Sequence, residues 1–287
     1  SKGFDVDIRL TQYKGHAEEI AKEIAQSGGS KEHEQLIISA GGDGTYNEVA
    51  NGLVSSTIPM AILPMGTTSV LAIELDIPKD IEEAVQSILN GVVIQINTGV
   101  INFFKNGQEF RRHFLLMAGI GYDAETVKGV DTGYKKTVGK LAYIISGLKT
   151  FLRKSNHSII ATIGNEDGIH TTVKCSNIII GKGAHYGGYF RVTPHASLIN
   201  PYFYCFLTHG TSRSALLRYV VGIITHRHLR LPDIEYMKGY QISLDGNAPI
   251  QIDGDYIGEL PAKITLGEKT LRFVVNSNFI GQKINLH

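Results

Sequence analysis

Glycines surround an acidic residue in the stretch Gly41-Gly42-Asp43-Gly44-Thr45, which follows a short apolar run and precedes a helical pattern. Consecutive glycines let backbone N–H groups converge on an anionic oxygen, and a helix N-terminus adds partial positive charge. The stretch therefore predicts a phosphate-binding loop. Asp43 would repel a phosphate unless a metal ion or water network lies between them, which indicates a Mg²⁺-dependent nucleotide site. The alternative is a tight strand-to-helix turn with Asp43 as a cap.

A second glycine loop contains Pro64, Gly66 and Thr67 and also lies between an extended run and a helical pattern. The carboxyl ends of parallel strands meet at one edge of a sheet, where α/β folds bind ligands. We therefore expect the two loops to lie side by side. By itself the second loop is weak evidence for a function.

Length and charge narrow the class of protein. The chain has 287 residues, near twice the roughly 150 residues of one domain, so we expect two domains. Its net charge is +1 and 19% of its residues are charged, below the typical ~25%, so no nucleic-acid partner is expected. No apolar run approaches the ~18 residues that span a bilayer, and the first residues do not resemble a signal peptide. We therefore expect a cytoplasmic protein.

Neither the cysteines nor the histidines show a metal-binding spacing. Cys175 and Cys205 lie in apolar, strand-like contexts without a Cys-x-x-Cys motif, which favours buried, reduced thiols. His16, His185 and His195 are expected to cap, pack or line a polar cleft.

The first hundred residues alternate helical and extended patterns, which predicts an α/β layer with a parallel sheet. Asp80 is expected to cap a helix, with Gly91 just past its end. The inward face of that helix is expected to hold Ile81, Ala84, Val85, Ile88 and Leu89. The expected elements are helices over residues 17–25, 47–54 and 81–89 and strands over residues 36–38 and 60–63.

From about residue 92 the pattern changes to short β-rich runs, which predicts an antiparallel sandwich or sheet pair. Helical insertions are expected over residues 138–152 and 212–225. No Pro- or Ser-rich linker is found, so we expect an α/β domain over residues 1–95, packed closely on a β-sandwich over residues 96–287, with a ligand cleft between them. The β-rich runs are residues 114–117, 158–163, 178–180, 202–207, 241–244, 262–266 and 271–275.

Several motifs together resemble the diacylglycerol kinase and sphingosine kinase superfamily, closest to its soluble bacterial lipid kinases. The resemblance covers nearly the whole chain in the family's order. NAD kinases share Gly-Gly-Asp-Gly-Thr, but the following Asn47-Glu48 and the late Asp-Gly-acid motif favour the lipid branch. The motifs are Gly41-Gly42-Asp43-Gly44-Thr45-Tyr46-Asn47-Glu48, Ile62-Leu63-Pro64-Met65-Gly66-Thr67, Ala72-Ile73-Glu74-Leu75-Asp76-Ile77-Pro78, Ala118-Gly119-Ile120-Gly121-Tyr122-Asp123-Ala124, residues 187–196 and Ile252-Asp253-Gly254-Asp255.

This resemblance implies an NAD kinase/diacylglycerol kinase-like α/β domain, a β-sandwich domain and an interdomain cleft where the γ-phosphate of ATP passes to a lipid hydroxyl. It implies Asp43 in a metal and water network and Asp253 and Asp255 as catalytic acids, with the choice of base left open. A carboxylate that accepts the attacking hydroxyl's proton fits this chemistry. The alternative for Asp253-Gly254-Asp255 is a plain hairpin turn. The implied nucleotide contacts are Thr11, Gly41, Gly42, Asp43, Gly44, Thr45, Tyr46, Asn47, Glu48, Gly66 and Thr67.

A structural magnesium site is also implied, at Ser197, Asn200 and Tyr202, with Ser197 and Tyr202 acting through backbone oxygens. The family's usual acid is Asn200 here, and neutral oxygens suit Mg²⁺ less well than a carboxylate. The alternative for Asn200-Pro201 is an ordinary turn.

Two departures from the family concern the nucleotide domain. Val70 stands where many relatives have an acid, which weakens the expected metal network. The family's opening strand and its Asn-Pro-x-Ser-Gly loop are not found, and residues 5–10 are expected to form the second strand. The α/β domain is therefore expected without its first strand.

Basic residues near the helical insertions suggest a surface for a lipid acceptor. Lys135, Lys136 and Lys140 flank the first insertion, and residues 226–230 flank the second, beside Tyr219, which we expect to be exposed. Each basic residue near an anionic bilayer contributes about 1 kcal/mol. We expect a transient contact with the inner face of the membrane; the alternative is a solvated surface. An exposed sandwich edge could also pair two copies into a homodimer.

The sequence thus predicts an ATP- and Mg²⁺-dependent lipid kinase with a diacylglycerol-like or sphingoid acceptor. One rival is an NAD kinase-like enzyme, because the same glycine loop serves there. Another is a regulatory nucleotide-binding protein that lost catalysis with Val70 and Asn200. The lipid itself is not identified, because acceptor selectivity depends on pocket shape and not on a motif.

Overall fold

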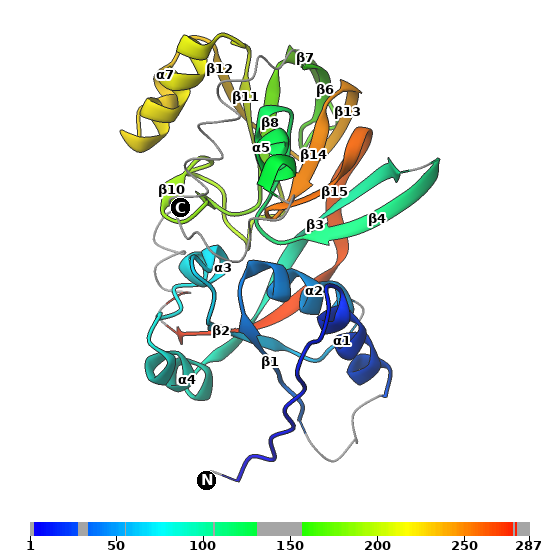
Figure 1. Cartoon of the computed structure of the whole chain (residues 1–287), viewed down its shortest axis with the longest axis vertical. Helices are drawn as coiled ribbons and strands as arrows, with labels where there is room; N and C mark the ends of the chain where they lie inside the picture. The colour runs from blue at the N-terminus through cyan, green and yellow to red at the C-terminus, as the bar shows by residue number, and fades with distance from the viewer. Residues whose placement is uncertain are drawn as a thin grey trace.

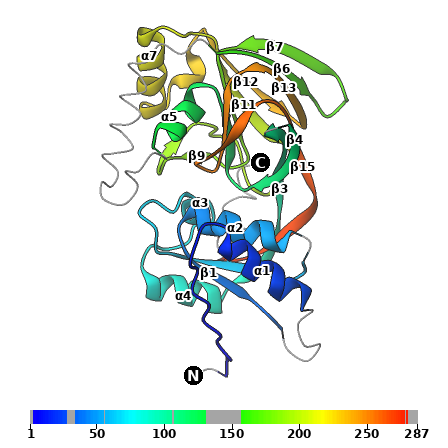
Figure 2. The same ribbon diagram turned by 45° about the vertical axis from the view of Figure 1, so that its right-hand side comes forward.

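The computed structural model describes residues 3–27, 34–54, 56–105, 107–130, 157–277 and 279. Figure 1 shows an α/β half below a larger β-rich half, and Figure 2 shows the same arrangement after a 45° turn. The predicted fold class, an α/β layer joined to a β-sandwich, is confirmed.

The α/β half contains two parallel strands that pair from Ile37 opposite Met60 to Gly41 opposite Pro64. The helices expected at residues 47–54 and 81–89 both form. The first, α2, begins at Asp43, four residues earlier than its apolar pattern suggests, and the extended Gly42 directly precedes it. The elements are α1 (His16–Gln26), β1 (Ile37–Gly41), α2 (Asp43–Leu53), β2 (Met60–Pro64), α3 (Val70–Glu74) and α4 (Ile81–Leu89).

Helix α4 confirms its predicted cap and corrects its predicted face. The Asp80 carboxylate accepts hydrogen bonds from the backbone N–H groups of Glu82 and Glu83, each at 3.0 Å. Ala84 is fully buried, but Ile81, Val85 and Leu89 are exposed. Only a narrow stripe of this short helix packs against the sheet, so the flanking apolar positions stay at the surface.

The β-rich half is antiparallel, as predicted, with β11 paired to β8 and β12 and with β13 paired to β6 and β15. The two runs expected at residues 262–266 and 271–275 form one long strand, β15. The elements are β3 (Val92–Lys105), β4 (Gln108–Phe114), β5 (Met117–Ile120), α5 (Tyr122–Val130), β6 (Ser158–Gly164), β7 (His170–Cys175), β8 (Asn177–Gly181), β9 (His185–Tyr186), β10 (Phe190–Arg191), β11 (Phe203–Thr208), α7 (Arg213–Ile224), the 3₁₀ turn η1 (His228–Arg230), β12 (Ile234–Gly239), β13 (Gln241–Asn247), β14 (Pro249–Ile252) and β15 (Asp255–Val275).

Strands β3 and β15 run through both halves, which Figure 1 shows as the long ribbons between them. β15 ends beside β2, with Phe273 opposite Met60. Phe273 and Val275 lie in the same apolar core as Tyr46 and Leu53 of α2. The end of the chain's last strand therefore completes the first half. The predicted boundary at residues 95 and 96 stays a prediction.

Several expectations near the surface change or remain open. Residues 5–10 form no strand, because no strand of the described chain pairs with them, and Val6, Ile8 and Leu10 are exposed. Helix α7 confirms the second insertion, but Tyr219 is buried and its hydroxyl bonds to Asp233. The expected helix over residues 138–152 lies outside the described residues, as do Lys135, Lys136 and Lys140.

Both cysteines are free and buried, which confirms the expectation of reduced thiols. Burial raises the pKa of the Cys175 thiol to about 12. The pKa of the Cys205 thiol is raised for the same reason. Neither thiol is therefore prepared to act as a nucleophile.

Candidate active site

The two glycine loops lie against each other at the carboxyl ends of β1 and β2, as predicted. The Gly66 N–H donates to the carbonyl of Gly41 at 2.8 Å, and the Met65 N–H donates to the same oxygen at 3.0 Å. A Cβ added at Gly66 would lie 2.8 Å from the Gly42 Cα. Glycine at position 66 is therefore needed for the two backbones to approach this closely.

Tyr46 connects the ends of the two strands that lead into these loops. Its side chain is fully buried, and its hydroxyl donates to the carbonyls of Gly41 at 2.6 Å and Leu63 at 3.0 Å. Both oxygens belong to the carboxyl ends of the two strands. The Tyr46 side chain therefore holds the two loops together. Its implied nucleotide contact stays a prediction.

Asp43 caps a helix, but not the helix that it begins. Its two carboxylate oxygens accept hydrogen bonds from the backbone N–H groups of Val70 and Leu71 in α3, each at 2.9 Å. Burial raises the pKa of Asp43, and these two hydrogen bonds oppose the change. The carboxylate thus faces α3 and caps its first turn. The implied role of Asp43 in a metal and water network stays a prediction.

A pocket lies where α2 begins and the two halves meet. It has a volume of about 280 Å³ and an acidic side chain, Asp255, from the β-rich half. The Lys14 ammonium lies 3.0 Å from the Asp255 Oδ1, and 34% of the Asp255 side chain is exposed. The pocket is lined by Thr11, Tyr13, Lys14, Gly44, Thr45, Glu48 and Asp255.

Five residues predicted from sequence thus meet in one pocket: Thr11, Gly44, Thr45, Glu48 and Asp255. Glu48 also caps the start of α1, because its carboxylate accepts hydrogen bonds from the N–H groups of Gly15 at 2.8 Å and Ala17 at 3.3 Å. Thr67 is exposed on the second loop and is not among the lining residues.

Asp253, two residues before Asp255, lies in a different environment. Its carboxylate accepts four hydrogen bonds: from the backbone N–H groups of Leu115, Leu116 and Met117 at 2.7, 2.9 and 3.0 Å, and from Asn47 Nδ2 at 2.8 Å. We call residues 115–117 and Asn47 the Asp253 cradle. Burial raises the pKa of Asp253 to about 6, although all four hydrogen bonds act in the opposite direction.

The cradle gives Asn47 and Asp253 a common function that the sequence did not reveal. The Asn47 amide donates hydrogen bonds to Asp253 and to the His113 carbonyl, at 2.8 and 3.1 Å, and its implied nucleotide contact stays a prediction. Asp253 has a φ of 47°, a left-handed conformation that tightens the turn before Asp255. Asp253 therefore positions Asp255 and links α2 to the β-rich half.

A second buried network supports the same hairpin and was missed from sequence. Asp123 accepts hydrogen bonds from the Tyr186 hydroxyl and from Gln251 Nε2, the latter at 2.6 Å, and burial raises its pKa. Gln251 Oε1 in turn accepts the Gly254 N–H at 2.8 Å. The glycine at position 119 was the signal in the sequence that could have pointed to this network. A Cβ added there would lie 1.7 Å from the Asp123 carboxylate, so a larger residue does not fit.

The three residues of the implied magnesium site lie on one turn, but they do not fit a metal ion. The Ser197 carbonyl, one of the implied ligands, already accepts the Asn200 N–H at 3.0 Å. The Asn200 carbonyl accepts a hydrogen bond from Lys182 Nζ at 2.5 Å, and Lys182 is fully buried. Burial lowers the pKa of the Lys182 amine to about 7. The amine of Lys182 thus binds this turn through the backbone carbonyl of Asn200, beside the neutral side chain that replaces the expected acid.

The described residues hold no group of three or more His, Cys, Asp or Glu side chains arranged to bind a metal ion. Asp43, the implied member of a metal network, uses both carboxylate oxygens as acceptors for α3.

Among the described residues, no helix is long and apolar enough to cross a membrane.

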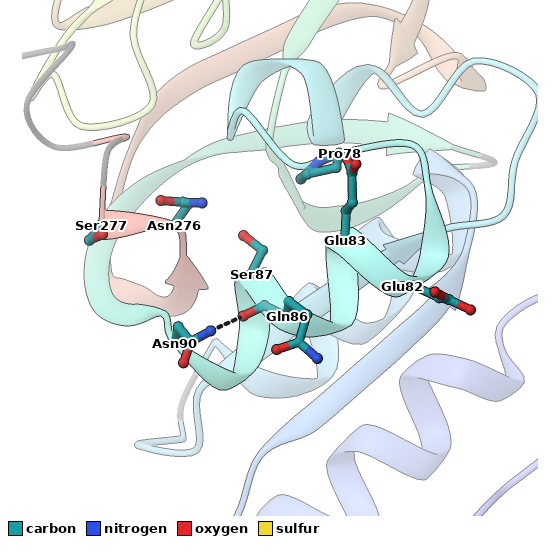
Figure 3. Close-up of a pocket in the computed structure, with 8 residues that line it drawn as sticks. All are labelled: Pro78, Glu82, Glu83, Gln86, Ser87, Asn90, Asn276 and Ser277. Carbon is teal, nitrogen blue, oxygen red and sulfur yellow. Dashed lines mark hydrogen bonds between the residues drawn. The ribbon is translucent and has the colours of Figure 1, made fainter.

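Another pocket, larger at about 530 Å³, lies away from these residues along α4. Figure 3 shows its polar lining, with Glu83 and Ser87 on one side of α4 and the Asn90 amide bonded to the Gln86 carbonyl. No residue predicted from sequence to bind or catalyse lies there. The smaller pocket is therefore the candidate active site.

Two family models match the chain. Residues 1–101 match the diacylglycerol kinase catalytic domain, and residues 117–275 match the YegS C-terminal NAD kinase beta sandwich-like domain. The two matches correspond to the α/β half and to most of the β-rich half, respectively.

Curated and solved proteins agree with these matches. A diacylglycerol kinase of Bacillus subtilis is 29% identical over 268 residues, covering 91% of this chain and 82% of that protein. An uncharacterised protein of Synechocystis is also 29% identical, and the chain spans 58% of its length. A crystal structure of a candidate diacylglycerol kinase from Bacillus anthracis has a TM-score of 0.73 at 25% identity, covering 94% of this chain and 84% of that one.

Proposed function

Since the chain belongs to the diacylglycerol kinase superfamily, in its branch of bacterial enzymes, we propose that it transfers the γ-phosphate of ATP to a hydroxyl of a diacylglycerol-like or sphingoid lipid. The two family models and the curated relatives support a family of lipid kinases. The acceptor and the activity of this chain are the proposal.

One observation carries it: the first turn of α2 and a carboxylate from the other half line the same pocket. Gly44 and Thr45 present backbone N–H groups at the positive end of a helix, which suits a phosphate. Asp255 stands across the pocket and suits a hydroxyl that must lose a proton. Such a pocket can hold the two groups that react in phosphoryl transfer.

In the proposed reaction, the lipid hydroxyl oxygen bonds to the γ-phosphorus while its proton passes to the Asp255 carboxylate. The bond from the γ-phosphorus to the bridging oxygen breaks, and ADP leaves. Asp253 holds the turn so that Asp255 faces the pocket, and Lys14 places a positive charge beside it. We propose that ATP is used as its Mg²⁺ complex; when bound, the ion would neutralise charge on the transferred phosphate.

The test is transfer of labelled phosphate from ATP to a panel of lipids in mixed micelles, including diacylglycerols and sphingoid bases. We expect Mg²⁺-dependent product with at least one of them and a strong loss in Asp255→Asn. Asp245→Asn is the matched control, because Asp245 is exposed on β13 away from the pocket. Background transfer by the wild type across the panel would overturn the proposal.

Two rivals have their own outcomes in the same experiment. The match to an NAD kinase beta sandwich-like domain makes NAD the acceptor to include beside the lipids. Formation of NADP without lipid phosphate would assign an NAD kinase-like enzyme. ATP binding in calorimetry without turnover of any acceptor would assign a regulatory nucleotide-binding protein.

We propose further that the lipid is met at an anionic bilayer, on the cytoplasmic side of the inner membrane, through one face of α7. Leu217, Val220, Val221 and Ile224 follow helical spacing and are each 45% to 56% exposed. The chain from residue 211 to 232 carries four arginines and no acid, and one of the four, Arg218, pairs with the neighbouring Asp233. An apolar stripe with a basic surround is the pattern of a helix that lies in a bilayer surface.

Sedimentation with vesicles tests this contact. The protein should bind vesicles containing phosphatidylglycerol better than vesicles of phosphatidylcholine alone, and Leu217→Ser with Val221→Ser should reduce binding at least about fivefold. Ile169→Ser is the control, because Ile169 is 64% exposed in the turn between β6 and β7. Equal binding by the α7 variant, or a wild-type dimer that the variant dissociates, would assign this face to something other than a bilayer.

A further inference from the structure

A buried lysine, Lys182, lies in the β-rich half, and the proposed reaction does not use it. Lys182 follows strand β8, and its side chain has no exposed surface. Lysine is almost never fully buried without a partner for its amine. The partner here is the backbone carbonyl of Asn200, 2.5 Å from Nζ.

The turn that receives this amine is the one where the family resemblance implied a magnesium ion. Asn200 brings a neutral amide where a carboxylate was expected, and its Nδ2 is buried with no hydrogen-bond partner among the described residues. The Ser197 carbonyl is committed to the turn itself. A metal ion would need to lie about 2.0–2.6 Å from such oxygens. The Lys182 amine donates to the backbone carbonyl of this same Asn200 and so already holds the turn from within the chain.

We propose that the side chain of Lys182 replaces the structural metal ion in this chain: its amine ties the Ser197–Tyr202 turn to the end of β8, so that no metal ion is bound there. The amine donates a hydrogen bond to the Asn200 carbonyl oxygen and so holds the turn, as a metal ion would hold it by binding oxygens of the turn. The acid at position 200 then becomes unnecessary, which accounts for Asn200.

The lysine also connects the turn to the Asp253 cradle. The backbone N–H groups of Lys182 and Gly183 both donate to the Leu116 carbonyl, at 2.8 and 2.9 Å. The N–H of the same Leu116 donates to Asp253. One residue therefore bridges the turn through its side chain and the cradle through its backbone. The cradle of this chain is accordingly expected to keep its geometry in the absence of divalent cations.

Thermal unfolding of the nucleotide-free protein tests the proposal without any activity measurement. The melting temperature of the wild type should change by less than about 1 °C between EDTA and 10 mM Mg²⁺ or Ca²⁺, since no ion binds the native state there. A rise of several degrees in the wild type, with metal found at the turn by Mn²⁺ binding, would overturn the proposal.

Two variants make the test sharper. Lys182→Asn combined with Asn200→Asp removes the amine and restores an acid, and should gain at least about 3 °C from Mg²⁺ or Ca²⁺. Asn200→Asp alone is the matched control: it has the acid but keeps the lysine, so it should gain no metal response. A metal response in the single variant as large as in the double variant would show that Lys182 does not exclude the ion. The wild type and the single variant decide the proposal even where the double variant does not fold.

Discussion

The Asp253 cradle and the pocket around Asp255 lie at the two ends of one hairpin turn and treat a carboxylate in opposite ways. The cradle surrounds Asp253 with four N–H donors, two on each carboxylate oxygen. The pocket leaves a third of the Asp255 side chain exposed, beside Lys14 and the first turn of α2. Two acids of one motif are therefore placed for two tasks: the first fixes the backbone, and the second is the one that we propose to meet the substrate.

The largest effect that would sharpen this comparison is expected in Asp255→Asn. An amide cannot accept the proton of the attacking hydroxyl, so kcat should fall by about 10²–10⁴-fold. The unfolding free energy should change by less than about 0.5 kcal/mol, because the side chain is partly exposed. Initial rates and urea unfolding of the same preparation measure both. A kcat within threefold of the wild type would remove Asp255 from the role of base.

Asp253→Asn should show the reverse pattern, with stability as its main loss. The new amide group would point N–H donors at the backbone N–H of Leu115 or at Asn47, where the carboxylate accepted hydrogen bonds. The expected cost is about 2 kcal/mol of unfolding free energy. Asparagine tolerates the left-handed φ of position 253, so the backbone itself is not strained by the change. Stability equal to that of Asp245→Asn would contradict the cradle.

The pH dependence of stability separates the two acids in another way. Burial raises the pKa of Asp253 from 3.8 to about 6 in the folded protein. Between these values the folded state binds more protons than the unfolded chain, so the unfolding free energy falls as pH rises from about 4 to 6. The contribution present below this window and lost above it is about 3 kcal/mol.

Because His113 also changes the unfolding free energy with pH, the effect of Asp253 must be measured as the difference between the wild type and Asp253→Asn. Burial lowers the pKa of His113 to about 4, so its contribution to stability is lost as pH falls, opposite in sign to that of Asp253. The wild type minus Asp253→Asn should therefore show the slope of Asp253 alone, because His113 is present in both proteins and cancels. Parallel curves for wild type and Asp253→Asn from pH 4 to 7 would refute the assignment.

Local signals predicted the elements of this fold well. The carboxylate of Asp80 caps α4 as its position before an apolar periodic run indicates, and the alternation of strands and helices places both glycine loops at one sheet edge. Such features depend on residues close together in the chain. The exposed face of α4 and the unpaired residues 5–10 depend instead on which neighbours pack or pair, which local pattern does not contain.

Within the candidate site, the motif predicted which residues gather but not what each one touches. Asp43, Tyr46 and Asn47 are consecutive or nearly so, yet their side chains reach α3, the two strand ends and Asp253, respectively. Position on a helix turns successive side chains by roughly 100°. The partner of Lys182 is still harder to foresee, because it lies on a turn 18 residues further along the chain.

The smallest predicted effect decides whether Asn47 belongs to the cradle or to the nucleotide. Asn47→Ala removes one of four donors to Asp253 and one hydrogen bond to the His113 carbonyl, which should lower the unfolding free energy by about 1 kcal/mol. Because its amide faces the cradle, KM for ATP should change by less than about threefold. A tenfold rise in KM with unchanged stability would return Asn47 to the nucleotide site, and it would leave Asp253 with only the three backbone donors of residues 115–117 to hold the turn before Asp255.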